Sequence, residues 1–258
     1  MSAMTTPGTL YLVPNALDVG SADADAALVE RLPLGTLRIA ARLGHWVCEN
    51  AKTTRAFLKR VDAVCRLEQP LQQIAIVELP RPPKGRPEAS AFDGDRLLAA
   101  AIAGSDVGLI SEAGLPAVAD PGARLVAAAH AAAIRVVALP GASAITLAVS
   151  ASGLNGQSFA FVGYLPIEAE ARAARIRELE AASRRFAQTQ VMIETPYRNA
   201  ALLGALLAQL QPSTMLSVSV GLTLAGESTR SHPVERWRSE PGTLPDDVPA
   251  VFSFLARR

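Results

Sequence analysis

The stretch Ser111–Gly122, SEAGLPAVADPG, places a serine, an acid and several small residues directly after the apolar run Val107–Ile110. Gly114 allows a ligand to approach the backbone closely, and α/β sheets bind ligands at the carboxyl ends of buried parallel strands. A plain turn from a strand into a helix is the alternative, because Asp120 followed by Pro121 is a common helix start. These residue types therefore suit either a ligand-binding loop or a capped turn.

A second loop, PGASAIT, repeats this arrangement after the apolar run Arg135–Leu139. Ser143 in this loop is placed either to contact a ligand or to cap the following helix. Two such loops after consecutive strands suit one shared crevice at the edge of a sheet. Neither loop matches the P-loop or the GxGxxG dinucleotide fingerprint, which argues against ATP, GTP and NAD as ligands.

Acidic residues with nearby cations stand at two further strand ends. The segment CENAKTTR contains Glu49, with Lys52 and Arg55 one helical turn apart, and the segment ETPYR contains Glu194 and Arg198. A carboxylate beside a cation is suited to removing a proton from an acceptor. The alternatives are structural: a solvated helix start for the first segment, and a proline turn held by Arg198 for the second.

The composition of the 258 residues is that of a globular protein, with 50% hydrophobic and 19% charged residues and a formal net charge of +1. This net charge gives no strong attraction to nucleic acid or to an anionic membrane. One segment is nevertheless rich in arginine, which forms either a solvated face or a phosphate contact: Arg172, Arg175, Arg177, Arg184 and Arg185.

Two cysteines and three widely separated histidines show no metal-ligand spacing, so we expect no metal ion. We find neither a signal peptide nor an apolar stretch of membrane-spanning length. We therefore expect a cytoplasmic protein that does not enter a membrane.

Short apolar runs alternate with alanine-rich runs at helical spacing, which predicts an α/β fold with parallel strands. The predicted strands are Leu10–Val13, Trp46–Cys48, Ile74–Val77, Val107–Ile110 and Arg135–Leu139. The predicted helices are Thr36–Leu43, Thr53–Val61, Asp95–Ala103 and Pro121–Ala132, and the basic, proline-rich stretch Arg81–Pro87 is an expected exposed loop.

A second domain is expected after a linker at residues 163–170, so that residues 8–162 form the first domain and residues 171–258 the second. A helix over Glu170–Phe186 should bury Ile176, Leu179 and Phe186 and expose a supporting pair of Glu180 and Arg184. The remaining predicted elements are the strands Gln190–Ile193, Leu216–Val220 and Ala250–Leu255 and the helix Asn199–Leu210. Two α/β domains with a cleft between them is the expected architecture.

Six segments, in this order, carry a resemblance: GTLYLVPNALDVG, GLISEAGLPAVADPGARLV, RVVALPGASAITLAVSASGL, FVGYLP, ETPYRN and LTLAGE. Together they resemble the tetrapyrrole (corrin/porphyrin) methylase superfamily of S-adenosylmethionine-dependent methyltransferases. The chain is most similar to the branch that contains the small-subunit ribosomal RNA 2'-O-ribose methyltransferase I. This resemblance implies a two-domain α/β fold, a homodimer, and S-adenosylmethionine bound in the interdomain cleft.

The resemblance also implies which residues contact the cofactor. In the first domain the loop after the first strand would flank the cofactor, the SEAG loop would form one wall, and Ser143 with Ala144 would form another. In the second domain Met192 and Leu222–Thr223 would close over the adenosine, with Pro249–Ala250 nearby. By position these are Pro14, Leu17, Ser111, Glu112, Ala113, Gly114, Ala117, Ser143, Ala144, Met192, Leu222, Thr223, Pro249 and Ala250.

The sequence departs from that branch mainly in the segments implied to face the substrate. PNALDVG stands where PTPIGNLGD is usual, ENAK stands where EDTR is usual, and ELPRPPKGRP replaces a stretch with His and Asn. The segments implied to face the cofactor match the family better than those implied to face the substrate, so the expectation of methyl transfer is firmer than that of its acceptor. The ribose 2'-hydroxyl of ribosomal RNA is the first acceptor that the resemblance implies. The alternatives are a methyltransferase for a tetrapyrrole or another small molecule, and a non-catalytic cofactor-binding protein of the same fold.

A ribose hydroxyl must lose its proton during methylation, so a carboxylate or a nearby cation is needed. Glu49, together with Lys52 and Arg55, is the first candidate for this role, and Glu194 is the second. Alignment of the acceptor with the methyl group and exclusion of water are the protein's other contributions.

Overall fold

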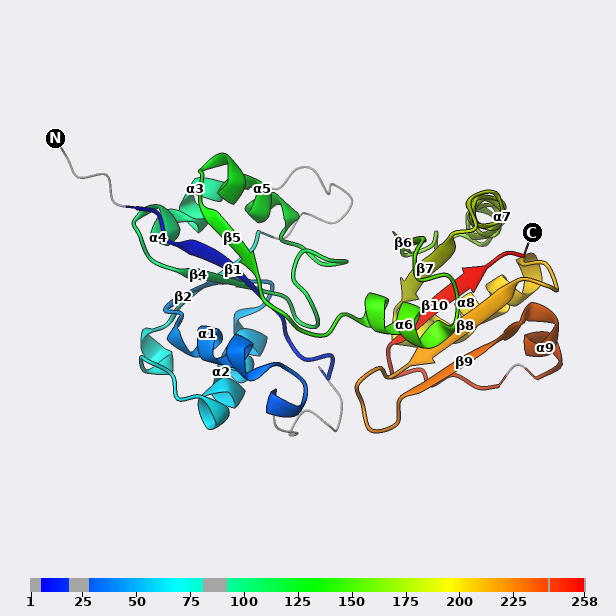
Figure 1. The fold of residues 1–258 in the computed structure, drawn as a ribbon, viewed down its shortest axis with the longest axis horizontal. Helices are drawn as coiled ribbons and strands as arrows, with labels where there is room; N and C mark the ends of the chain where they lie inside the picture. The colour runs from blue at the N-terminus through cyan, green and yellow to red at the C-terminus, as the bar shows by residue number, and fades with distance from the viewer. Residues whose placement is uncertain (1–5, 19–27, 81–91, 241, 258) are drawn as a thin grey trace. The chain divides into compact units, whose positions relative to one another are not determined.

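The computed structural model describes residues 6–18, 28–80, 92–240 and 242–257 (Figure 1). By its contacts the chain divides into two compact units, Met1–Ala142 and Ser143–Arg258. This division falls before the expected linker at residues 163–170. The reason is that α6 (Ala144–Ser152) packs on the sheet of the second unit rather than with the first.

The first unit contains a five-stranded sheet in which every strand pair is parallel. The strand order is β3-β2-β4-β1-β5. All five predicted strands are confirmed to within one residue at each end: β1 (Thr9–Val13), β2 (His45–Cys48), β3 (Ala75–Glu78), β4 (Val107–Ile110) and β5 (Arg135–Ala138).

Helices cover both faces of this sheet (Figure 1). Successive strand residues point to opposite faces, so Tyr11 and Val13 join one apolar cluster while Leu10 joins another. The first cluster lies under α1 (Leu34–Arg42) and α2 (Ala51–Val64), and the second under α4 (Ala99–Ile102) and α5 (Ala123–Ala131), with α3 (Gly94–Leu97) beside α5. Two short 3₁₀ turns complete the described part of this unit, η2 (Leu28–Glu30) and η3 (Leu71–Gln73).

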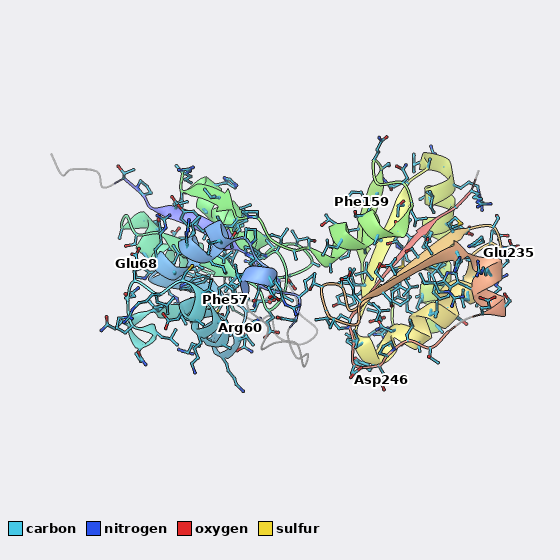
Figure 2. All side chains as sticks on the ribbon, turned by 60° about the horizontal axis from the view of Figure 1, so that its bottom comes forward. Phe57, Arg60, Glu68, Phe159, Glu235 and Asp246 are labelled. Atoms are coloured by element: carbon cyan, nitrogen blue, oxygen red, sulfur yellow. The ribbon has the colours of Figure 1, made fainter. Side chains whose placement is uncertain are left out.

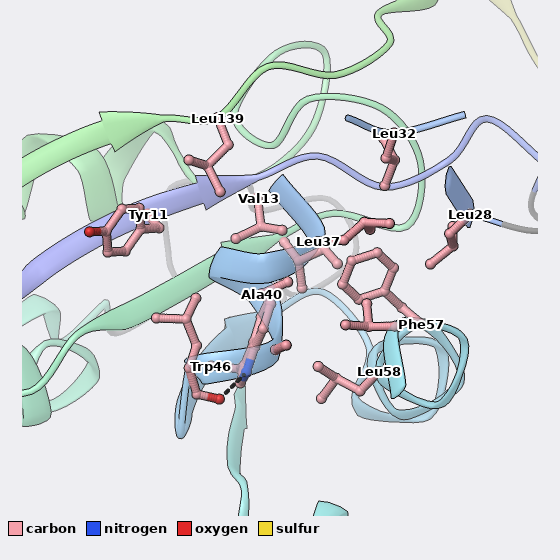
Figure 3. Close-up of a cluster of buried hydrophobic side chains, with 14 of the residues drawn as sticks. Tyr11, Val13, Leu28, Leu32, Leu37, Ala40, Trp46, Phe57, Leu58 and Leu139 are labelled. Carbon is pink, nitrogen blue, oxygen red and sulfur yellow. Dashed lines mark hydrogen bonds between the residues drawn. The ribbon is translucent and has the colours of Figure 1, made fainter. Parts of the chain in front are cut away.

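The cluster under α1 and α2 is built around a buried tryptophan (Figure 3). Trp46 donates its indole N–H to the carbonyl of Leu43 at 3.0 Å. Its ring meets the ring of Phe57 edge to face, with centroids 6.1 Å apart. The indole is thus both buried in apolar contacts and satisfied as a hydrogen-bond donor, which fixes α1 and α2 on the sheet.

Two helix predictions in this unit are wrong in detail. The expected helix Asp95–Ala103 is broken at Leu98 into α3 and α4. The expected start of the next helix at Asp120 and Pro121 is also wrong, because α5 begins at Ala123 with Gly122 as its N-cap. Gly122 has a φ of 130°, a conformation that a right-handed helix does not contain, so the helix cannot begin before it. The predicted loop Arg81–Pro87 lies outside the described residues.

The second unit has a mixed sheet, in which parallel and antiparallel strand pairs occur together. Its order is β6-β7-β10-β8-β9, and only β6 and β7 run parallel. The predicted strands correspond to β7 (Thr189–Glu194), β8 (Met215–Val220) and β10 (Ala250–Leu255). The two outer strands, β6 (Phe159–Gly163) and β9 (Ser228–Pro233), are not among the predicted strands.

Helices cover both faces of the second sheet as well. On one face α6 places Ile145, Ala148 and Val149 against Val191 and Val251. The other face packs against α7 (Ala169–Phe186), α8 (Asn199–Gln209) and α9 (Val234–Ser239), and the 3₁₀ turn η4 (Pro196–Arg198) leads into α8. Among the described residues, no helix is both long and apolar enough to cross a lipid bilayer.

Helix α7 confirms two predicted core positions and corrects two others. Ile176 and Leu179 are buried, but Phe186 is 59% exposed. Glu180 is 5% exposed, so it does not form the expected surface pair with Arg184. Its position four residues after Ile176 places it on the inward stripe of the helix. There its carboxylate accepts hydrogen bonds from the Gln211 amide at 2.8 Å and from the Thr214 hydroxyl.

Candidate functional site

The loops that follow β1, β2, β4 and β5 lie at the same edge of the first sheet, because parallel strands place all their carboxyl ends together. The strands β1 and β4 are neighbours. The helix that follows β1 packs on the face of Val13, whereas the helix that follows β4 packs on the face of Leu109. The two loops therefore leave the sheet toward opposite faces, and such a switch point is where α/β sheets bind ligands.

Asn15 joins these two loops. Its backbone exchanges hydrogen bonds with Gly114, N to O at 2.9 Å and O to N at 3.1 Å. Its side-chain amide donates to the carbonyl oxygens of Glu112 at 2.9 Å and Ser111 at 3.4 Å, and its side-chain oxygen accepts from the Ala16 amide. We call this set of bonds the Asn15–Gly114 clasp. In the sequence Asn15 stands in PNALDVG, a departure from the family pattern, and it is not among the predicted site residues.

Glycines bring the loops close together. Gly114 has a φ of 68°, and a Cβ at this position would lie 3.2 Å from Cδ2 of Leu17. A Cβ on Gly141 would overlap the ring of Pro14. The loops after β1, β4 and β5 thus approach one another as closely as glycine permits.

Left-handed residues shape the remainder of the loop after β4. Ala117 and Ala119 have φ values of 65° and 64°, which non-glycine residues rarely adopt. Each such residue costs roughly 1–2 kcal/mol, so the surrounding contacts must hold this backbone in place. The Ser111 hydroxyl contributes by donating to the carbonyl of Ala113 at 3.1 Å.

Three carboxyl groups, those of Glu49, Glu112 and Asp120, come from the loops after β2 and β4 and interact electrostatically at this edge. Glu49 accepts a hydrogen bond from the Glu112 amide through Oε2 at 2.9 Å, and the Asn50 side chain donates to Oε1 of Glu112 at 3.2 Å. Burial, and next the negative charge of Glu49, raise the pKa of Asp120 to about 6. This edge therefore carries concentrated negative charge. In the described ranges, no three His, Cys, Asp or Glu side chains form a group that could hold a metal ion.

The segment CENAKTTR contains the start of α2, which agrees with its structural interpretation as a solvated helix start. Asn50 caps the helix by accepting from the amides of Lys52 at 2.9 Å and Thr53 at 3.4 Å. The side chains of Lys52 and Arg55 are exposed, and Arg55 donates to the carbonyl of Ala51. Of the three residues chosen for catalysis in this segment, Glu49 is the one bonded to the loop after β4.

Asp18, in the loop after β1, is held by two arginines and is not among the predicted site residues. It is 1% exposed and forms an ion pair with Arg60 through two bonds of 2.8 and 3.1 Å. Arg31 lies 3.5 Å from the same carboxylate. Arg60, labelled in Figure 2, is partly exposed, with 25% of its side chain accessible.

In the second unit, four of the residues expected to contact a cofactor gather at one edge of the sheet. Ala250 pairs with Glu194 on one side and with Val220 on the other. The Gly221 amide donates to the carbonyl of Pro249 at 3.0 Å, which brings the start of β10 beside the end of β8. The four residues at this edge are Leu222, Thr223, Pro249 and Ala250.

Two other residues expected to contact the cofactor, Met192 and Ser143, lie away from this group of four, one in the core and one at the start of α6. Met192 is fully buried in the core formed with α7 and α8. Ser143 is the N-cap residue of α6, with Ala144 directly after it, but its hydroxyl makes no capping hydrogen bond. Capping by the Ser143 side chain, one of the two alternatives for this loop, is therefore wrong.

Glu194 is held in the way that the structural alternative for ETPYR describes. Its side chain is 2% exposed and pairs with Arg198 at 3.0 Å. It also accepts a hydrogen bond from the Thr195 amide at 2.9 Å. The carboxylate thus braces the turn between β7 and α8.

Residues 32–236 match the family model described as Tetrapyrrole (Corrin/Porphyrin) Methylases. Ribosomal RNA small subunit methyltransferase I of Mesorhizobium japonicum is 40% identical over 138 residues, which are 54% of this chain and 46% of that protein. The protein of the same name from Xylella fastidiosa is 33% identical over 178 residues, 68% of this chain and 56% of that protein. The chain spans about half the length of the curated relatives it matches.

A solved structure shares the fold. The crystal structure of uroporphyrin-III-C-methyltransferase from Thermus thermophilus superposes with a TM-score of 0.51 and 23% identity, covering 96% of this chain and 92% of that chain. Its two-domain α/β architecture agrees with the two units described above.

Proposed function

Because this chain belongs to the tetrapyrrole (corrin/porphyrin) methylase family, we propose that it is an S-adenosylmethionine-dependent methyltransferase that acts on the ribose 2'-hydroxyl of ribosomal RNA. The names of the relatives support RNA as the acceptor. The observation that carries the proposal is the Asn15–Gly114 clasp, which joins two small-residue loops at the switch point of a parallel sheet.

The chemistry of the loop edge fits this cofactor. When bound, S-adenosylmethionine supplies an electrophilic methyl group on a positively charged sulfur. The carboxyl groups of Glu49, Glu112 and Asp120 favour a cation at this edge. Gly114 has no Cβ, so a ligand can approach its backbone closely. The neighbouring backbone groups supply donors and acceptors.

The residues proposed to contact the cofactor come from both units. In the first unit they are Pro14, Leu17, Ser111, Glu112, Ala113, Gly114 and Ala117. In the second they are Ser143, Ala144, Leu222, Thr223, Pro249 and Ala250. Met192 acts here by supporting the neighbouring strand ends, because its side chain lies in the core.

Glu49 is the proposed general base. The Glu112 amide orients its carboxylate at the loop edge, where we expect it to accept the proton of the ribose hydroxyl. Lys52 and Arg55, exposed on the first turns of α2, are proposed to bind the phosphates beside that ribose. Glu194 ranks second, since its carboxylate already bonds Arg198 and Thr195.

Calorimetric titration with S-adenosylmethionine and S-adenosylhomocysteine tests the cofactor site. We expect saturable binding of both, and loss of binding in Gly114→Val. Gly153→Val is the matched control, because Gly153 also has a φ of 68° but a Cβ added there would meet nothing within 4 Å. Both variants carry the same backbone strain, so a loss confined to Gly114→Val reports on the site.

Absence of binding at millimolar concentration would contradict the proposed function. The acceptor is tested separately, by transfer of a labelled methyl group to small-subunit ribosomal RNA and to a tetrapyrrole. Transfer to the tetrapyrrole alone would contradict RNA as the acceptor, and cofactor binding without transfer to any acceptor would indicate a non-catalytic protein.

We extend the proposal to a cytoplasmic homodimer, which the family resemblance implies and the location of ribosomal RNA suits. Sedimentation velocity over a range of protein concentrations should show a species of twice the 27.0 kDa chain mass. A mass of one chain at all concentrations would exclude the dimer.

A further inference from the structure

Charge is distributed unevenly within the second unit. Acidic residues lie near the edge where β8 ends and β10 begins, among them Glu227, Asp246 and Asp247. Figure 2 shows Asp246 at one end of this unit and Glu235, at the start of α9, at the other. Several arginines lie at the end that contains α9.

Four elements bring these arginines together around the turn Gln211–Thr214. Arg177 of α7 donates to the side chain of Gln209 at 2.6 Å, and Arg238 of α9 donates to the carbonyls of Leu207 and Leu210, both at 2.8 Å. Arg184, also from α7, donates to the carbonyl of Arg257 at 3.3 Å. The second half of α7, the C-terminal ends of α8 and β10, and α9 therefore lie near one another.

The hydrogen-bond acceptors of Arg177, Arg184 and Arg238 are uncharged oxygens, so they do not neutralise the positive charges of these arginines. We define the basic end by five exposed residues: Arg177, Arg184, Arg185, Arg238 and Arg257. In the part of the chain that the structure describes, none of the five forms an ion pair with a carboxylate. By contrast, Arg175 on the same helix pairs with Glu178 at 2.7 Å, and Glu240 is shared between Arg230 and Arg236.

An exposed aromatic ring adjoins the basic end. Phe186, the last residue of α7, is 59% exposed. The guanidinium of Arg185 lies 5.1 Å from the centre of its ring. Aromatic rings and guanidinium planes are the surfaces on which unpaired bases stack in single-stranded RNA complexes.

We propose that the basic end binds single-stranded RNA, with its arginines on the phosphates and Phe186 stacked on a base. This inference rests on the proposed function, because an RNA acceptor is long enough to contact the protein away from the methylated nucleotide. Cations and an exposed ring together favour RNA over an anionic membrane, which offers no bases to stack.

The test measures binding of a fluorescently labelled 20-nucleotide oligouridylate by anisotropy between 50 and 300 mM KCl. The triple variant Arg177→Gln, Arg184→Gln, Arg185→Gln should bind about 100-fold more weakly at 0.1 M salt, and the slope of log Kd against log salt should fall by about 2, or about 0.7 for each arginine replaced. Phe186→Ala should weaken binding about tenfold without changing the slope.

The matched control is the triple variant Arg38→Gln, Arg66→Gln, Arg135→Gln. These arginines are exposed in the first unit, and their removal changes the net charge equally. This control should bind the oligonucleotide within about threefold of the unchanged protein. Equal weakening in both triple variants would overturn the proposal, because it would reflect net charge alone.

Calorimetry with S-adenosylmethionine on the same variants separates this inference from the proposed function. If the cofactor binds and RNA is methylated, but the first triple variant binds RNA normally, the basic end is not an RNA contact while the function stands. If the cofactor does not bind at all, the function fails whatever the anisotropy shows. Binding to phosphatidylserine vesicles through the same arginines, without RNA binding, would also overturn the inference.

Discussion

At the residue scale, Glu49 combines two roles that one substitution separates. Its carboxylate accepts a hydrogen bond from the Glu112 amide, and it is the proposed base. In Glu49→Gln the side-chain oxygen still accepts that bond but takes no proton. We expect single-turnover methyl transfer to fall at least 100-fold while the calorimetric Kd for S-adenosylmethionine changes less than threefold.

The matched control is Glu78→Gln. Glu78 is an exposed carboxylate at the same edge, and it also accepts a backbone hydrogen bond, from Ala51 at 2.8 Å. Its substitution should leave turnover unchanged. Unchanged turnover in Glu49→Gln would remove Glu49 as the base.

Asp120 predicts a pH dependence of stability. The pKa of Asp120 is about 6 in the folded protein, against an ordinary value of 3.8, so the folded state binds the proton more tightly than the unfolded state. The stability of the folded state therefore falls as the pH rises from about 4 through about 6. Asp120→Asn removes this effect. Relative to the unchanged protein, the variant should gain about 1–2 kcal/mol between pH 4.5 and 7.5 in urea unfolding, a value reduced for solvent screening. A difference that does not change with pH would contradict the raised pKa.

Some site residues were predictable from the sequence and others were not. The loop after β4 was predictable because glycine and small residues directly follow an apolar run. Asn15 was missed because its role depends on Glu112, which lies 97 residues further along the chain. Asp18 was missed for the same reason, since Arg60 follows it by 42 residues. Side-chain partners so distant leave no periodic pattern in one sequence.

At the element scale, Glu180 ties α7 to the turn that follows α8. Its buried carboxylate accepts from the Gln211 amide and the Thr214 hydroxyl. Glu180→Ala should lower the free energy of unfolding by about 2–3 kcal/mol, because both donors lose their acceptor in a buried place. Urea unfolding followed by circular dichroism measures this change.

Glu178→Ala is the control on the same helix. Its side chain is 69% exposed and pairs with Arg175 at the surface, so the expected change is less than about 0.5 kcal/mol. Equal effects of the two substitutions would mean that the Glu180 bonds add nothing to stability.

Strands were predicted correctly where their residues are buried, because burial requires apolar side chains and so leaves a recognisable pattern in the sequence. Every residue of β4 is buried, which requires a continuous apolar run and makes the strand easy to recognise. The edge strand β9 reads STRSHP and is only partly buried, so no hydrophobic pattern marks it. The start of α5 was misjudged because a left-handed glycine, rather than the Asp-Pro pair, determines where the helix begins.

At the scale of the whole molecule, each unit contains one of the two tryptophans. Trp46 lies in the core of the first unit and Trp237 in that of the second. Trp237→Phe therefore leaves Trp46 as the fluorescent reporter of the first unit, and Trp46→Phe leaves Trp237 as the reporter of the second. With S-adenosylmethionine at 100 times its Kd, we expect about 2.7 kcal/mol of stabilisation in urea unfolding with either reporter, since the proposed contacts come from both units.

Stabilisation seen with one reporter alone would confine the cofactor contacts to that unit. Gly114→Val introduced into each reporter protein is the control and should abolish the effect of the ligand. The position of the division between units was itself hard to predict, because α6 follows the last strand of the first sheet but packs on the second.

The Asn15–Gly114 clasp and the left-handed residues Ala117 and Ala119 fix the loop after β4 when the first unit folds. Ordering a free loop costs about 1–2 kcal/mol of conformational entropy per residue. Here that entropy is lost during folding, so association with a small ligand does not include it. A rigid loop also discriminates by fixed shape, and it rejects a bulkier ligand that a pliable loop would accommodate.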